Sequence, residues 1–264
     1  MFINTRAAQH VLKCIKENSC VTITASAGVG KTAILRHVAL QMSEEEYEIL
    51  YVFDPFDIMR FYNPNQKTLF VIDDLCGVYG IDERNLQLWQ QVVERIKTVL
   101  QNNLYTKIIA ACRLQVCQDD RFKALSVCNT CVCNLLSENI CLTKNEKKSI
   151  AELYLENNVS EITNYYELYD CFPLLCKLSH DNPNLNIIDF FKNPFSVYEA
   201  EIEMLLKEGH YAKYCALALC VMFNNNLREE ILTEDVDEVA IIENTCEACR
   251  LDKRTHRPIL LDAL

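Results

Sequence analysis

Residues 25–32, with the sequence ASAGVGKT, constrain the fold of this chain more than any other feature. They follow an apolar, β-branched run at residues 21–24. They also precede a stretch in which Ala33, Ile34, Val38 and Met42 recur at helical spacing. A glycine-rich turn that joins a strand to a helix and ends in Gly-Lys-Thr is the pattern of a phosphate-binding loop, although Ala25 stands where that pattern has its first glycine. The segment therefore predicts a strand, a P-loop and a helix in direct succession.

The P-loop pattern assigns roles to its residues. Backbone N–H groups of such a loop surround a phosphate at the positive end of the helix. Gly28 and Gly30 allow the close approach, Lys31 reaches the β and γ phosphates, and Thr32 offers its hydroxyl to Mg²⁺. The predicted loop contacts to a nucleotide are Ala27, Gly28, Val29, Gly30, Lys31, Thr32 and Ala33.

Two further polar sites follow predicted strands. Asp73 and Asp74 come directly after the run at residues 69–72, and Arg113 follows the run at residues 107–111. Ligands of open α/β sheets bind at the carboxyl ends of strands, so these side chains are expected near the P-loop. We predict Thr32 and Asp73 as metal ligands, and Asp74, Lys31 and Arg113 as the catalytic set. For Arg113, a surface ion pair with Asp119 or Asp120 is the alternative.

The pattern of strands and helices predicts a fold class. Short apolar runs alternate with helical patterns, including one at residues 83–100, which is typical of a parallel sheet with flanking helices. The expected strands cover residues 21–24, 49–53, 69–72, 107–111 and, more weakly, 130–135. We therefore predict an α/β P-loop NTPase domain at residues 1–140.

Strand patterns end near residue 142, where Thr143 and Glu146 form a capping box at the start of a new helix. Further helices are expected at residues 173–179, 187–191, 197–206 and 211–222. Residues 141–232 are therefore predicted to form a helical lid domain. Residues 233–264 are interpreted as the start of a truncated winged helix or as a terminal helical segment.

Composition limits the environment and the partners of the chain. Its formal net charge of −11 over 264 residues disfavours nucleic acid as a partner. The longest apolar stretch, residues 214–223, has half the length of a membrane span of about 20 residues, and no secretory signal is visible. An odd count of 15 cysteines indicates reduced thiols and a cytoplasmic protein.

Two groups of residues have spacings that suggest zinc. One comprises Cys128, Cys131, Cys133 and Cys141, and the other comprises Cys246, Cys249 and His256. In a strand, Cys131 and Cys133 would point to one face and Val132 to the other, which favours packing in a core. We expect most of these thiols to be buried apolar groups.

Taken together, these motifs resemble a STAND-class P-loop NTPase, related to the NACHT and NB-ARC switches. The resemblance is closest to the novel STAND NTPase domains abundant in invertebrates. It extends over most of the chain, at residues 2–6, 54–58, 71–77, 111–114, 133–137, 142–143 and 172–176.

The resemblance implies further contacts and a function. It places Thr5, Arg6 and Pro173 at the adenine and ribose, with Cys171 standing where the family has the glycine of a Gly-x-Pro motif. It implies an ATP- or ADP-binding, Mg²⁺-dependent switch with slow hydrolysis, in signalling or innate-immune-type regulation. No arginine finger is evident, so rapid turnover would require a protein partner or a homo-oligomer. The alternatives are a nucleotide-binding interaction module without turnover and a small-molecule phosphotransferase.

Overall fold

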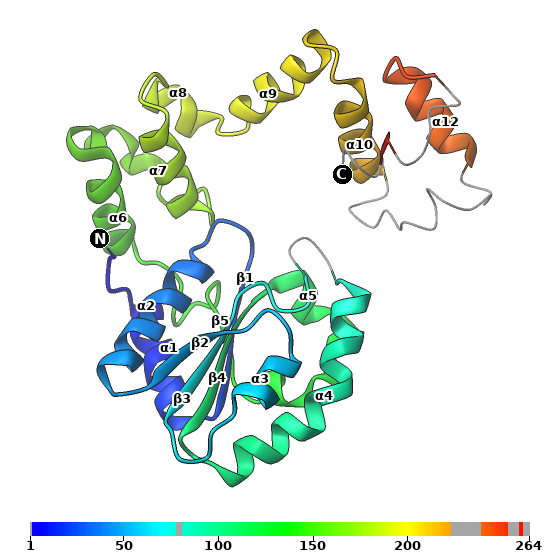
Figure 1. The fold of residues 1–264 in the computed structure, drawn as a ribbon. Coiled ribbons are helices and arrows are strands. Elements are labelled where there is room, and N and C mark those ends of the chain that lie inside the picture. Colours follow the sequence, from blue (N-terminus) through cyan, green and yellow to red (C-terminus); the bar gives the residue numbers. More distant parts are fainter. Residues whose placement is uncertain (1, 78–80, 223–238, 253–258, 261–264) are drawn as a thin grey trace. The chain divides into compact units, whose positions relative to one another are not determined.

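The structure of the protein is a computed structural model that describes residues 2–77, 81–222, 239–252 and 259–260 (Figure 1). The chain divides into two compact units, Met1–Lys192 and Asn193–Leu264. The boundary expected at residue 140 lies inside the first unit. The division into 1–140, 141–232 and 233–264 stays a prediction.

A parallel sheet forms the centre of the first unit. Its spatial order is β2-β3-β4-β1-β5, and every neighbouring pair runs parallel. The sheet confirms the predicted α/β class, and each strand overlaps a predicted segment. The strands are β1 Cys20–Ala25, β2 Glu48–Tyr51, β3 Thr68–Ile72, β4 Thr106–Arg113 and β5 Val132–Asn134.

Helices cover both faces of this sheet (Figure 1). Alternate residues of β3 and β4 enter two different apolar cores, as the two-residue period of a strand requires. Leu69, Val71 and Ile109 pack with α1 (Arg6–Glu17) and α2 (Lys31–Glu44), whereas Phe70 and Ile108 pack with α4 (Glu83–Asn102). Burial on both faces explains why these strands read as continuous apolar runs.

Helix α4 agrees with the helix predicted at residues 83–100. The Asp82 carboxylate accepts a hydrogen bond from Asn85 N–H at 2.9 Å and caps the helix. The predicted apolar stripe is buried and includes Trp89, the single tryptophan of the chain. Helices α3 (Phe56–Phe61) and α5 (Leu114–Gln118) are shorter.

Helix α1 was not predicted from the sequence. Thr5 caps it by accepting a hydrogen bond from Ala8 N–H at 3.2 Å, and Ala8, Val11 and Ile15 line its buried face. A threonine cap followed by apolar residues three or four positions apart is a helix signal. In this segment the polar residues between the apolar ones obscure it.

A helical region follows the sheet within the first unit. It comprises α6 (Lys144–Leu155), the 3₁₀ segment Glu156–Tyr165, α7 (Phe172–Asp181) and α8 (Ile187–Lys192). Phe172 and Phe191 are fully buried there, with ring centroids 5.9 Å apart. The helices predicted at residues 173–179 and 187–191 are confirmed.

The second unit is helical where the structure describes it. It contains α9 (Ser196–Lys207), α10 (Tyr211–Met222) and α12 (Val239–Ala248), and the first two confirm their predictions. Its small core joins Cys215, Leu219 and Ile242. The predicted acidic helical pattern lies partly outside the described residues. Every helix among the described residues is too short or too polar to cross a bilayer.

Candidate functional site

The predicted P-loop joins β1 to α2. Gly28 and Gly30 have φ angles of 76° and 108°, which glycine adopts without the strain that a side chain would bring. Ala25 is the last residue of β1, fully buried and paired in register with Arg113 of β4. It has no positive φ, and therefore this strand position does not require the glycine of the usual pattern.

Lys31 is buried at the start of α2. Its Nζ donates hydrogen bonds to the carbonyl oxygens of Ala25 at 3.0 Å and Ser26 at 2.9 Å. Burial, followed by the nearby positive charge of Arg113, lowers the pKa of Lys31, while Asp74 and Asp73 act in the opposite direction. An anionic phosphate beside this ammonium would favour its charged form.

Thr32 and Asp73, the two predicted metal ligands, lie next to each other. Thr32 Oγ1 donates a hydrogen bond to Asp73 Oδ1 at 3.1 Å. Neighbouring ligands of an octahedral Mg²⁺ with bonds of about 2.0–2.1 Å are about 2.9 Å apart. The two oxygens therefore have the spacing and the hard-oxygen chemistry that Mg²⁺ needs.

Asp74 begins a tight turn after β3. Its φ of 50° is unusual for a residue other than glycine. Its N–H donates to Asp73 Oδ1 at 3.2 Å, and Leu75 N–H donates to Ala111 O of the neighbouring strand at 2.8 Å. These bonds hold both half-buried carboxylates at the end of β3.

Arg113 ends β4, which lies between β1 and β3 in the sheet. This strand order places the arginine between the P-loop strand and the strand that carries the two acids. The acids considered as its alternative partners each have another cation, because Asp119 pairs with Arg121 at 2.8 Å and Asp120 with Lys123 at 2.6 Å. Lys31, Thr32, Asp73, Asp74 and Arg113 thus converge at one edge of the sheet.

A cavity of about 90 Å³ lies beside the P-loop. Five of its lining residues are among the predicted nucleotide contacts, namely Thr5, Val29, Gly30, Ala33 and Pro173. Pro173 lies in the first turn of α7 and also lines the cavity, so a proline at a helix start and a cavity-lining residue are the same residue here. Ala27 is exposed in the loop, outside this lining.

The apolar part of this lining was missed from the sequence. It comes from the N-terminal segment and α6, and includes Phe2, Ile3, Ile150, Leu153 and Tyr154. Residues of this kind on an amphipathic helix look like ordinary core positions. The walls of the cavity are nevertheless largely apolar.

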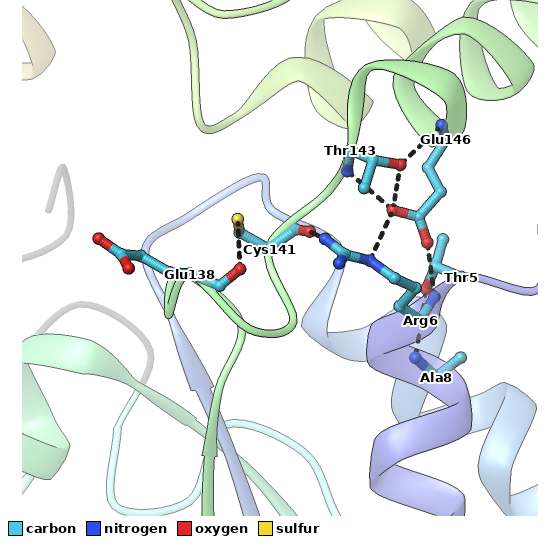
Figure 2. A network of polar contacts seen from close by, with 7 residues as sticks. All are labelled: Thr5, Arg6, Ala8, Glu138, Cys141, Thr143 and Glu146. Carbon is cyan, nitrogen blue, oxygen red and sulfur yellow. Dashed lines mark hydrogen bonds and ion pairs between the residues drawn. The ribbon is translucent and has the colours of Figure 1, made fainter.

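Arg6 lies in a polar network that ties α1 to α6 (Figure 2). Its N–H donates to Glu146 Oε1 at 2.5 Å, and its guanidinium donates to Cys141 O at 2.8 Å. Glu146 also accepts from Thr143 N–H at 2.8 Å, which confirms the predicted capping box. Arg6 does not line the cavity, so its nucleotide contact stays a prediction.

The helical region rests directly on the P-loop. Leu174 N–H donates to Gly28 O at 3.3 Å. A Cβ atom added to Gly28 would lie 2.9 Å from the Cβ atoms of both Cys171 and Leu174. A side chain at position 28 would therefore press against the first turn of α7.

The two groups of cysteines whose spacings suggest zinc lie in different units of the chain. Cys133 is buried while Val132 is exposed, as predicted for this strand. In the second unit, the Cys246 and Cys215 sulfurs are 3.8 Å apart within the apolar core. His256 lies outside the described residues.

The sheet order, the loop after β1, the acids after β3 and the arginine after β4 define a P-loop NTPase. The chain belongs to the Novel STAND NTPase 3 family, whose model matches residues 2–157. Comparison with curated proteins finds no significant match.

Solved structures with similarity to the chain share little of its sequence. A DNA replication initiation factor is 15% identical, with 97% of this chain and 80% of that chain covered and a TM-score of 0.35. A RuvB variant of Thermotoga maritima is 13% identical, with coverages of 97% and 85% and a TM-score of 0.44. AMPPCP-bound DnaA from Aquifex aeolicus is 13% identical, with coverages of 100% and 87% and a TM-score of 0.37.

Proposed function

We propose that this protein is an ATP- or ADP-binding, Mg²⁺-dependent molecular switch that hydrolyses ATP slowly. The observation that carries the proposal is the contact of α7 with the P-loop at Gly28. A loop that closes around a phosphate changes the surface on which α7 rests. Nucleotide binding and the position of the helical region would therefore be coupled.

The convergent side chains divide the chemical work. Bound Mg²⁺, held by Thr32 and Asp73, would neutralise developing charge on the phosphates. Lys31 would exchange its carbonyl partners for the β and γ phosphate oxygens. Asp74 would orient the attacking water or take its proton, and Arg113 would contact the γ phosphate.

The cavity beside the loop supports a place for the base. Thr5, which caps α1, Gly30 of the P-loop and Pro173 of α7 contribute to it, so a bound nucleoside would bridge the P-loop and the helical region. A ligand shifts such an equilibrium only by its differential affinity for two arrangements. Nucleotide at about a thousand times its dissociation constant stabilises the binding arrangement by about 4 kcal/mol, which is enough to reorganise a modest contact.

The cellular setting belongs to the same proposal. All 15 cysteines are free, which fits a reducing cytoplasm. Signalling of the innate-immune type is the role suggested by the family. Faster turnover would come from a protein partner or a second copy that supplies an arginine.

Lys31→Ala tests nucleotide binding, and Lys107→Ala is its matched control. Lys107 is also buried, and its Nζ donates to the carbonyl oxygens of Lys16 at 3.2 Å and Asn18 at 3.0 Å, near the opposite end of β4. We expect ATP affinity, measured by calorimetry, to fall by at least about 100-fold in Lys31→Ala and by less than about threefold in Lys107→Ala, because only the first removes a phosphate contact. Equal ATP affinity in the Lys31 variant and the parent would refute the proposal.

Hydrolysis separates the switch from an interaction module without turnover. Phosphate release from ATP should be measurable in the parent and lost in Asp74→Asn, with ATP affinity retained. Cys171, in the place of the family's glycine, is the feature that favours the module. Parent protein that binds ATP but releases no phosphate would establish that alternative.

A further inference from the structure

A second group of polar side chains lies away from the P-loop, between α1 and the edge strand β5. His10 Nε2 and the sulfurs of Cys14 and Cys133 all lie within 4.8 Å of one another. Cys131 is the candidate for a fourth ligand, because it packs at the same core and its thiol neighbours those of Cys14 and Cys133. Two thiols and one imidazole therefore meet in one place, and a third thiol lies beside them.

The secondary structure explains why these four side chains meet. His10 and Cys14 are four residues apart on α1 and so lie on the same face of the helix. Cys131 directly precedes β5 and Cys133 lies within it; they are two residues apart, and both pack at the core that α1 covers. Helix α1 thus supplies two side chains to this place and β5 supplies Cys133, while Cys131, two positions earlier in the chain, lies next to them.

The spacing of these atoms suits a tetrahedral metal. With Zn–S bonds of about 2.3 Å and Zn–N bonds of about 2.0–2.1 Å, a sulfur and a nitrogen ligand are about 3.5 Å apart. Cys14 Sγ and His10 Nε2 are 3.4 Å apart. Soft sulfur ligands with one imidazole match the preference of Zn²⁺ and differ from the hard oxygens of Thr32 and Asp73.

We propose that His10, Cys14, Cys131 and Cys133 form a structural Zn²⁺ site. On binding, three Zn–S bonds and one Zn–N bond form, and the protons of the three thiols pass to solvent. His10 is exposed, so the ion can enter from solvent. A site closed by four protein ligands leaves no open coordination position for catalysis.

This metal would fasten α1 to the edge of the sheet. Helix α1 begins at Arg6, directly after Thr5 of the cavity lining, and β5 is paired with β1, which leads into the P-loop. Zinc at this point would hold the N-terminal segment against the nucleotide-binding half of the sheet. The metal site itself does not depend on the proposed ATP chemistry.

Metal content is the direct test. The protein is purified under reducing conditions without chelator, and its zinc is measured by inductively coupled plasma mass spectrometry. We expect about one equivalent in the parent and in the control Cys220→Ser, and less than about 0.2 equivalents in Cys14→Ser and Cys133→Ser. Cys220 is a partly exposed thiol of α10, outside the cluster.

His10→Gln keeps the test independent of core packing, because this side chain is exposed. We expect this substitution to weaken Zn²⁺ affinity by more than about 100-fold. Loss of a residue that only hydrogen-bonds to a metal ligand typically weakens metal affinity by about 10- to 100-fold, and the loss of a ligand itself should exceed this. Cobalt(II) added to the metal-free parent should give the visible bands of a tetrahedral ion and thiolate charge-transfer bands, and Cys14→Ser should weaken the latter. A parent without zinc and without these bands, or the same zinc content in all the variants, would overturn the proposal.

Discussion

Replacement of Gly28 by alanine tests the contact between the P-loop and α7. Gly28 has a φ of 76°, and the added Cβ would lie 2.9 Å from three atoms, Cys171 Cβ, Leu174 Cβ and Leu174 Cδ2. Only the last is the end of a flexible side chain. The two Cβ atoms can move only if the first turn of α7 moves with them.

The cost of this change has two parts. A left-handed backbone conformation costs a residue with a Cβ about 1–2 kcal/mol. Overpacking at a site without free space costs a further 1–3 kcal/mol, approximately. Gly28→Ala is therefore expected to lower the free energy of unfolding by about 2–5 kcal/mol if α7 stays on the loop. If α7 instead separates from the loop, the overpacking is relieved, and the free energy of this local opening falls by about 1–3 kcal/mol.

Gly30→Ala is the matched control in the same loop. Gly30 has a φ of 108°, and no atom lies within 4 Å of its added Cβ, so only the backbone term applies. Fluorescence of Trp89, which is buried against the sheet, follows unfolding in urea. Amide hydrogen exchange follows α7 separately. We expect exchange in the α7 amides to become about 5- to 150-fold faster in Gly28→Ala and to stay unchanged in Gly30→Ala.

The result that would refute this reasoning is specific. If α7 exchanges equally fast in the Gly28 variant, the Gly30 variant and the parent, the loop and the helix are not in contact at Gly28. The coupling behind the proposed switch would then have no structural basis. Partial rescue of Gly28→Ala by Cys171→Gly, which removes one of the two clashing Cβ atoms, would support it.

Three further predictions concern the helical region and its tie to α1. Burial acts to raise the pKa of Glu146, but hydrogen bonds from Thr143 and Arg6 outweigh it and keep this pKa below its ordinary value. The charged carboxylate therefore stabilises the fold above about pH 4.5, and this stabilisation is lost as the pH falls through the lowered pKa. The urea unfolding curves of the parent and Glu146→Gln should consequently converge in acid. Thr143→Ala should cost about 1 kcal/mol in the same assay through loss of the helix cap, whereas equal stability would contradict the capping role. Phe172→Ala removes a fully buried ring and should cost about 3–5 kcal/mol, measured by calorimetric unfolding; a cost below about 1 kcal/mol would mean that the aromatic cluster is not a packed core.

Local patterns were sufficient for much of this fold. Apolar runs of strand length marked all five described strands, and the spacing of Leu86, Trp89 and Val93 marked α4. The Thr143 capping box marked the start of α6. These signals depend on neighbours within one or two turns, so they are complete in the sequence itself.

The polar part of the site could be listed from the sequence for a similar reason. Parallel strands bring their carboxyl ends to one edge, so Lys31, Asp73 and Arg113 could be grouped without knowing the order of the strands. The apolar wall could not be found in this way. Phe2, on the N-terminal segment, and Tyr154, on α6, have no local feature that separates a cavity-lining residue from a core residue.

The sequence by itself therefore determined the P-loop, the alternation of strands and helices, and the polar residues that follow the strands. Tertiary structure alone decided that β4 lies between β1 and β3, that α7 rests on Gly28, and that His10 and Cys14 meet Cys133. The physical reason is range. Backbone conformation and helix caps are set by adjacent residues, whereas strand order and packing bring together groups that are tens to more than a hundred residues apart, which no local pattern encodes.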